Sequence, residues 1–395
     1  MKDYTDANNL IAGFNKANKV SSWKYKTQCY RINLLKETCR LQQELRNHTY
    51  KQSEGSSFKI CEQGHLRLIK ALAVRDTVMQ QSLTNTVLIP ELAKYMIHDN
   101  GASLKGKGIS FTRRRFEQHL AWHYRRYGRE GYILKIDFRK YFDNIPHDKL
   151  RQAVAKHIDS KEVLWILDKI LEANEQDISY MDNDFKESPF NALEQAEIAP
   201  ELLTGKRKLK RSLGIGSTVS QIAGIYLPTR IDTWCKYVRK VHCYDAYMDD
   251  RIIIHPSKEF LRQLLNEVTA MAKAMGFFIH NDKTQIIKLS HGFTFLKTRY
   301  SLTDTGRIIR KIPKDVIARE RHKLNKLARL TAGGKLTVKQ YKAQYRAWRG
   351  DKIRYNAYYA LKETDKLYRR NLQWITKNRK QLPKNSRKLS TLDVT

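Results

Sequence analysis

Residues 243–255 read CYDAYMDDRIIIH, and this stretch decides the fold. Apolar residues flank a short polar centre, which predicts a hairpin of two strands within Val241–His255. The tip of that hairpin carries two neighbouring acids, Asp249 and Asp250. Taken alone, an Asp-Asp pair in a turn is explained by contact with solvent. A third acid changes this interpretation, because Asp137 lies at the end of another short apolar run, residues 131–138, which predicts a buried strand.

Acids at the ends of buried strands need a compensating charge. An unpaired charge there costs several kcal/mol, and Asp249 and Asp250 also repel each other. Mg²⁺ is the simplest partner, because it prefers carboxylate oxygens and substrate phosphates. Three carboxylates from two strands could hold two ions about 3.5–4 Å apart. One ion would activate a 3′-hydroxyl, and the other would stabilise a leaving pyrophosphate.

The composition points to a polyanionic partner. The chain has 395 residues, with 75 Lys and Arg against 40 Asp and Glu, a formal charge of +35. Such a surface repels itself unless a polyanion such as nucleic acid compensates it. No apolar stretch is long enough for a membrane span. Five cysteines without a CxxC pair, and no apolar leader, predict a protein of the reducing cytoplasm.

Helices are expected on both sides of this α/β region, in residues 1–60 and from Pro313 onward. The C-terminal helices should form three segments, broken near Gly333-Gly334 and near Gly350. The expected elements between them are a hairpin and helix in 59–81, helices in 111–127, 147–157, 161–173, 217–240 (bent at Pro228) and 257–275, and strands in 277–289 and 293–312.

Five motifs occur in one order along the chain. They are DFRKYFDNIPH at Asp137–His147, GSTVSQ at Gly216–Gln221, YMDD at Tyr247–Asp250, the Lys283-Thr284 pair, and FTFL at Phe293–Leu296. Together they resemble the palm motifs of bacterial reverse transcriptases. Lys297 stands where the family has a glycine, and Ile215 stands where many members have glutamine. The segment around Gly216 is most similar to reverse transcriptases of diversity-generating retroelements, and defence-associated enzymes share much of the pattern.

This resemblance assigns roles to individual residues. It implies that Asp137, Asp249 and Asp250 are the catalytic, Mg²⁺-binding carboxylates. Phe142 would exclude a ribose 2′-hydroxyl, although core packing is its ordinary explanation, and an exposed strand lysine is the ordinary explanation of Lys283. The residues implied in substrate binding are Phe142, Gly216, Gln221, Arg67 and Lys283. Those expected to bind nucleic acid are Lys105, Lys107, Arg346, Arg349, Lys352 and Arg354.

The resemblance implies an α+β fold of the right-hand polymerase type, with fingers, a palm with a small antiparallel sheet, and a helical thumb. Residues 1–55 would form a helical extension, 56–312 the fingers and palm, and 313–395 a basic thumb and tail. The implied function is RNA-directed DNA synthesis, a nucleotidyl transfer with two Mg²⁺ ions and deoxynucleoside triphosphates, on a structured non-coding RNA. The setting would be a bacterial or phage retroelement or an antiviral defence system.

Several alternatives stay open. One is a catalytically silent RNA-binding protein on a polymerase scaffold, although all three carboxylates are present. Another is template-independent or protein-primed DNA synthesis, which 21 tyrosines permit but no motif favours. An accessory protein or a second copy of the chain could also be a partner.

Overall fold

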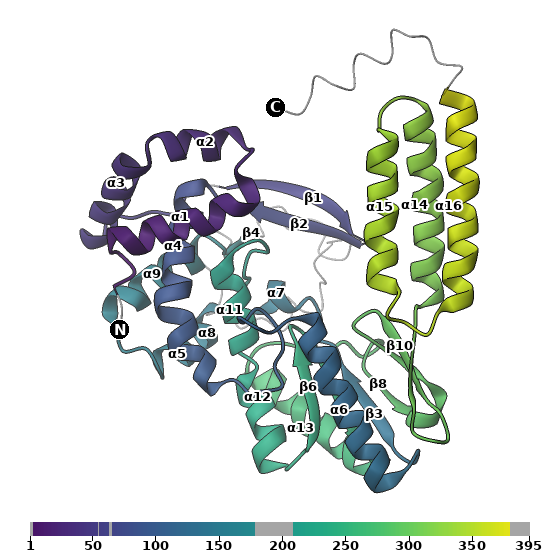
Figure 1. Ribbon diagram of the computed structural model, residues 1–395. Helices are drawn as coiled ribbons and strands as arrows, with labels where there is room; N and C mark the ends of the chain where they lie inside the picture. The colour runs from purple at the N-terminus through teal and green to yellow at the C-terminus, as the bar shows by residue number, and fades with distance from the viewer. Residues whose placement is uncertain (1–2, 54, 63–64, 178–207, 380–395) are drawn as a thin grey trace, which may run out of the picture. The chain divides into compact units, whose positions relative to one another are not determined.

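The computed structural model describes residues 3–53, 55–62, 65–177 and 208–379. The chain divides into two compact units, one of Met1–His119 with Ile133–Ile286 and one of Leu120–Tyr132 with Ile287–Thr395. Figure 1 shows the elements in chain order, with the N-terminal helices in purple and the C-terminal helices in yellow-green. Within the described residues, no helix is both long enough and apolar enough to cross a bilayer.

Three helices begin the first unit, as the sequence predicts. They are α1 (Ala7–Ser21), α2 (Tyr25–Ile32) and α3 (Leu34–Arg46). The Asp6 carboxylate caps α1 by accepting from the backbone N–H groups of Asn8 and Asn9, which satisfies two otherwise unpaired donors. A methyl group at Gly13 would lie 2.7 Å from the Val78 carbonyl oxygen, so glycine allows α1 to approach α4 (Val74–Leu83) closely.

An antiparallel hairpin precedes α4. Its strands are β1 (Ser56–Glu62) and β2 (His65–Ala71), and their register pairs Ser56 with Ala71. The expected hairpin leading into a helix is therefore confirmed. After α4 the chain continues through the π-helical turn η1 (Thr84–Leu88), α5 (Ile89–Leu92), the 3₁₀ turn η2 (Ala93–Tyr95) and α6 (Ile109–Tyr127).

A four-stranded sheet with the order β6-β7-β3-β8 carries the predicted carboxylates. Its strands are β3 (Tyr132–Ile136), β6 (Cys243–Tyr247), β7 (Asp250–His255) and β8 (Gln285–Lys288). Strands β6 and β7 form the predicted antiparallel hairpin, pairing Cys243 with Ile254. The apolar run Ile252–Ile254 is buried without alternation, which is typical of a strand covered on both faces.

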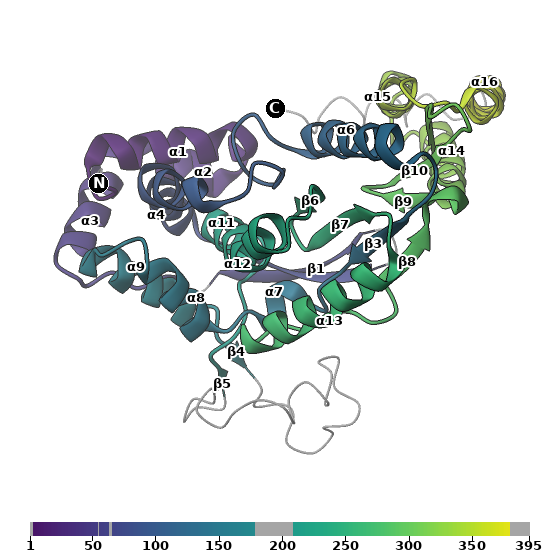
Figure 2. The same cartoon turned by 90° about the horizontal axis from the view of Figure 1, so that it is seen from below.

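Further helices belong to this part of the chain. They include α7 (Tyr141–Asn144), α8 (His147–Ala155), α9 (Lys161–Glu172), α11 (Thr218–Tyr226) and α13 (Lys258–Ala274). Figure 2 shows α13 along one face of the sheet, and α13 contacts β7. Ser257 caps α13 as predicted, and Gly276 ends it at φ +82°, a conformation that favours glycine. The two-residue strands β4 (Gln176–Asp177) and β5 (Lys208–Leu209) pair separately.

Two expectations about this unit were wrong in detail. The helix expected over 217–240 is interrupted rather than bent, because α11 ends at Tyr226 and Pro228 precedes a separate helix, α12 (Thr229–Thr233), and the π-helical turn η5 (Trp234–Val238). Proline cannot donate the backbone hydrogen bond that would continue α11. The strand expected over 277–289 forms only at β8, because residues 281–283 make a turn closed by N–H groups that donate to the His280 carbonyl.

The second unit combines a small sheet with three helices. The sheet order is β11-β10-β9, with strands Phe293–Phe295 (β9), Thr298–Leu302 (β10) and Ile308–Lys311 (β11). The helices are α14 (Lys314–Ala332), α15 (Val338–Lys352) and α16 (Tyr358–Arg379). Their core includes Leu324, Tyr341, Tyr345 and Ile375. The break near Gly333 is confirmed, whereas Gly350 lies inside α15 and the second break follows Lys352, because an exposed helical glycine costs only about 1 kcal/mol.

Candidate active site at the β6–β7 turn

The β6–β7 turn presents Asp249 and Asp250 at one end of the sheet. Met248 takes φ +53° there, and Tyr247 pairs with Asp250 across the hairpin. The next residue, Arg251, is only 1% exposed, and its guanidinium Nη1 donates to the Met248 carbonyl oxygen at 2.5 Å. The unusual backbone of the turn is therefore fixed from inside the protein.

A buried carboxylate compensates the charge of Arg251. The guanidinium Nε donates to Asp232 Oδ1 at 3.1 Å, and both side chains are 1% exposed. The Tyr244 hydroxyl donates to the same oxygen at 2.7 Å. Because Asp232 lies in α12 and Tyr244 in β6, this cluster links the turn to the helix behind it.

Asp137 and Asp250 line one cavity of about 320 Å³, although they lie on different strand ends. Burial, together with the negative charges of Asp249 and Asp137, raises the pKa of Asp250 to about 6. The structure thus brings Asp250 within electrostatic reach of both other sequence-predicted carboxylates, Asp137 and Asp249. Clustered carboxylates whose repulsion opposes ionisation are the donor set that hard divalent cations favour, so these residues fit Mg²⁺.

Lys283 is the predicted cation nearest to this cluster. Its Nζ lies 3.5 Å from Asp137 Oδ2, and the lysine side chain is 58% exposed. Exposure leaves the ammonium accessible to a second anion from solvent. Asp282 also lines the cavity, which sequence reasoning did not identify because it lies in the turn before β8.

Phe142 lies in a short helical turn, because α7 begins directly after Lys140, which takes φ +40°. The buried Tyr141 hydroxyl donates to the Gly224 carbonyl at 2.6 Å. A methyl group at Gly224 would lie 2.8 Å from Phe142 Cε1, so the half-buried Phe142 ring covers α11 at its glycine. Packing thus accounts for part of the requirement for this ring.

Gly216 begins the motif before α11 at φ +129°, and a methyl group there would lie 3.0 Å from the Lys70 carbonyl oxygen. The Lys70 N–H donates to the Ile215 carbonyl at 3.3 Å, so β2 contacts this turn directly. Gln221 is exposed on α11. Arg67 lies in β2 opposite Ile60, and its side chain is outside the described part of the structure.

The basic loop before α6 lies beside β6. A bridge joins Asn100 to Ala246, and the Lys107 ammonium donates to the carbonyls of His98 at 2.8 Å and Asn100 at 2.9 Å. Lys107 therefore holds the loop itself together, whereas Lys105 is exposed.

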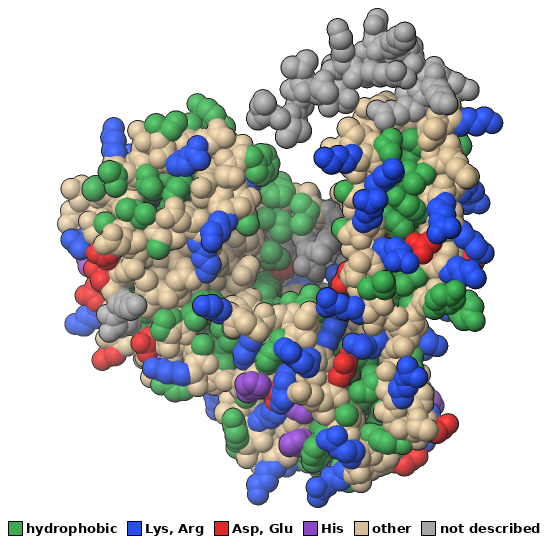
Figure 3. Space-filling model, viewed as in Figure 1, with side chains coloured by type: hydrophobic (Ala, Val, Ile, Leu, Met, Phe, Trp, Pro, Cys, Tyr) green, Lys and Arg blue, Asp and Glu red, His purple; other side chains and the backbone are tan. Residues whose placement is uncertain are grey.

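In the second unit, too, some of the predicted nucleic-acid-binding cations contact other groups of the protein, and others are exposed. Arg349 binds Asp365 through two hydrogen bonds of 2.8 and 3.1 Å, and Lys352 lies 2.6 Å from Asp351. Arg346 and Arg354 are exposed. Figure 3 shows Lys and Arg side chains gathered over α14–α16 on one face of this unit.

Sequence reasoning missed a buried cluster of Asp99, His119 and Asp245, whose ligand atoms lie close enough to hold a metal ion. His119 Nδ1 lies 2.8 Å from Asp245 Oδ2. Asp99 is already bound by Arg115 at 2.6 Å and Lys236 at 2.7 Å. Burial alone would raise the pKa of Asp99, but these two hydrogen bonds hold it well below its usual range. A metal ion would compete with both cations, so the contacts describe an ion-pair network.

One sequence signal could have located this network. Asp245 is a charged residue at the centre of an otherwise buried strand, where a partner is required. The network joins α6 to β6, and the Ala246 N–H donates to the Asp99 carbonyl at 3.1 Å. It therefore positions the strand that leads into the turn.

Comparison with known structures gives low similarity. A telomerase from Candida albicans in complex with a fragment of telomeric RNA has 13% identity and a TM-score of 0.44, with 72% of this chain and 52% of that chain covered. An apo telomerase from Candida tropicalis has 12% identity and a TM-score of 0.42, with 66% and 49% covered. The chain thus spans about half the length of these telomerases. No curated protein matches the chain.

Comparison with protein families identifies one family. Residues 61–299 match the family described as reverse transcriptase (RNA-dependent DNA polymerase). That range contains strand β2, the Asp137 segment, the turn before α11 and the β6–β7 turn, in the order that the motifs predict. The fold is accordingly of the polymerase type, mixed helix with small sheets, as expected. The chain therefore belongs to the reverse transcriptase (RNA-dependent DNA polymerase) family.

Proposed function

We propose that this protein is an RNA-directed DNA polymerase whose catalytic residues are Asp137, Asp249 and Asp250. The observation that carries the proposal is the shared cavity of Asp137 and Asp250, where repulsion and burial raise the pKa of Asp250 to about 6. Mutual repulsion among carboxylates in a cavity destabilises a fold, and carboxyl groups with pKa values raised in this way mark functional sites. Family membership supports the same reaction.

The protein's own groups would orient the reactants. The Arg251 hydrogen bond to Met248 holds the turn, so that Asp249 and Asp250 are preorganised before substrate arrives. Two Mg²⁺ ions held by the three carboxylates would supply Lewis-acid activation of a 3′-hydroxyl and stabilisation of the pyrophosphate. Lys283, exposed beside Asp137, would neutralise charge on that leaving group.

The remaining substrate contacts are proposed from the resemblance to the family. Gly216 and Gln221 would contact the base pair and its backbone, Arg67 the triphosphate, and Phe142 the sugar. In this proposal residues 1–55 are an extension, 56–312 the fingers and palm, and 313–395 the thumb with its tail. The exposed residues Lys105, Arg346 and Arg354 would bind nucleic acid phosphates, and Arg349 and Lys352 would do so only by leaving their carboxylate partners.

The template is proposed to be a structured non-coding RNA of a bacterial or phage retroelement or of an antiviral defence system, copied into cDNA. A charge of +35 supports a nucleic-acid partner but does not distinguish among these settings. Sequencing the RNA and DNA that copurify with the protein tests this part. A single abundant structured RNA with matching cDNA is expected, and recovery of random cellular RNA alone would contradict it.

The reaction is tested by primer extension with Mg²⁺ and labelled deoxynucleotides. The double variant Asp249→Ala with Asp250→Ala should lose extension completely, because both carboxylates of the turn are removed, while retaining RNA binding. Asp168→Asn is the matched control, since it removes a carboxylate from an exposed ion pair with Arg151. Extension by the double variant at the control's rate would refute the assignment.

A further inference from the structure

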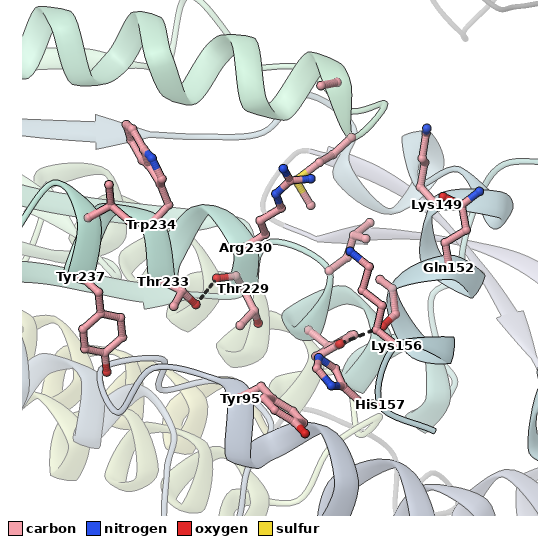
Figure 4. Close-up of a pocket in the computed structure, with 16 residues that line it drawn as sticks. Tyr95, Lys149, Gln152, Lys156, His157, Thr229, Arg230, Thr233, Trp234 and Tyr237 are labelled. Carbon is pink, nitrogen blue, oxygen red and sulfur yellow. Dashed lines mark hydrogen bonds between the residues drawn. The ribbon is translucent and has the colours of Figure 1, made fainter. Parts of the chain in front are cut away.

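A second cavity, of about 700 Å³, lies in the first unit. Among the described residues, it shares no lining residue with the cavity of Asp137 and Asp250. Its walls come from α8, α11, α12, η5, Tyr95 and the end of α13, as Figure 4 shows. The volume lies within the range of about 300–1,000 Å³ typical of ligand sites. Residues from separate helices therefore enclose a space of ligand size that the proposed polymerase reaction does not use.

The cavity wall is cationic. Lys149 comes from α8, Lys156 directly follows α8, and Arg230 comes from α12; all three side chains are exposed. The described residues that line the cavity include no Asp or Glu. In addition to burial, the charges of Lys156 and Lys94 lower the pKa of His157, which reports a positive potential at this wall. A bound anion would relieve the repulsion among these groups.

Aromatic rings stand among these cations. The rings of Tyr95 and His157 are stacked, with centroids 3.6 Å apart and planes 18° from parallel. Tyr95 is 42% exposed and Tyr237 is 70% exposed, and both rings lie toward the lower edge of the view in Figure 4. Exposed rings beside phosphate-binding cations are the usual arrangement for stacking unpaired bases. An acidic peptide would use the cations and leave the rings without a partner.

We propose that this cavity binds unpaired nucleotides of an RNA strand, with the phosphates at Lys156 and Arg230 and a base against Tyr237. The cations and rings of the cavity wall fit the phosphates and bases of any strand of linked nucleotides. The choice of RNA rests on the proposed function. In this arrangement the protein contacts its RNA at a second point, so that the RNA stays bound independently of catalysis. The side chains of Gln152 and Thr233, which line the same cavity, offer hydrogen bonds to base edges.

The test measures binding of a short, labelled, unstructured RNA by fluorescence anisotropy without Mg²⁺ or deoxynucleotides. Polymerisation therefore does not enter the readout, and a failure of the proposed reaction leaves this result unchanged. The variant Lys156→Gln with Arg230→Gln should lower the slope of log K against log salt by about 1.4, or about 0.7 for each lost phosphate contact. The matched control is Lys161→Gln with Arg262→Gln, two exposed cations on α9 and α13, which should leave the slope unchanged.

A second pair of variants tests the base contact. Tyr237→Ala should weaken binding roughly tenfold, whereas Tyr237→Phe, which keeps the ring, should not. Equal slopes for the two double variants would overturn the proposal. A competition experiment adds ATP or poly-glutamate at a negative charge equal to that of the RNA. The proposal would also be overturned if either competitor displaced the RNA from the unchanged chain but not from the Lys156→Gln, Arg230→Gln variant. Those outcomes would assign the cavity to a free nucleotide or to an acidic protein segment.

Discussion

The substitution Asp232→Asn removes the carboxylate that forms a buried ion pair with Arg251. The amide nearly preserves the carboxylate's shape and keeps an oxygen that can accept from Tyr244, so packing and that hydrogen bond are largely retained. What is lost is the negative charge beside a guanidinium that is 1% exposed. The variant therefore isolates the charge from the shape of the side chain.

The expected magnitude follows from burial. Removing one partner of a buried ion pair costs about 3–5 kcal/mol, because the other charge is left without solvent or counter-charge. Asp168→Asn is the control, because its ion pair with Arg151 is 34% and 46% exposed and has a similar distance of 2.8 Å. An exposed pair contributes about 0–1 kcal/mol. The two variants should therefore differ by at least about 2 kcal/mol.

Urea unfolding of the full chain, followed by fluorescence, measures this difference in the transition that reports the first unit. The double variant Asp232→Leu with Arg251→Met should recover much of the loss, because no unpaired charge remains. It should still extend primers poorly, because the Met248 carbonyl has lost its donor. Equal destabilisation by Asp232→Asn and Asp168→Asn would refute the view that Arg251 and Asp232 hold the turn.

Two further predictions concern stability. Gly276→Ala should lower the free energy of unfolding by about 2–5 kcal/mol, because φ is +82° and the new methyl group would lie 2.3 Å from Pro146 Cγ. Gly128→Ala, at φ +61° with open space around it, should lower it by about 1–2 kcal/mol, and equal losses in urea unfolding would contradict the clash. Burial lowers the pKa of His147 to about 4, and the ring N–H donates to the Ser212 carbonyl. As the pH falls, His147 is therefore protonated in the unfolded chain before it is protonated in the folded protein. The free energy of unfolding should fall by about 3 kcal/mol as the pH drops from about 6.5 to 4. His147→Gln should flatten that dependence, and an unchanged pH profile would show that His147 does not cause it.

Local chemistry explains what could be predicted from the sequence. Caps such as Ser217 and Ser257 act within four residues, and the apolar runs of β3 and β7 need only to be buried. The structure places Asp137, which directly follows β3, and Asp250, the first residue of β7, on one cavity, and their catalytic role stays a prediction. Even so, the second helical break and the end of α11 were placed wrongly, since neighbouring packing decides such boundaries.

Tertiary structure alone decided which charges pair. The sequence shows Asp232, Asp245 and Arg251 as three charged residues in apolar surroundings, and only the packing of α12 and α6 against β6 assigns their partners. The cavity proposed to bind RNA also depends on tertiary packing, because Lys156, Arg230 and Tyr95 come from separate parts of the chain. Spacing along the chain determines which residues share a face of one element. Which faces meet depends on the burial of the whole core, and no segment encodes that by itself.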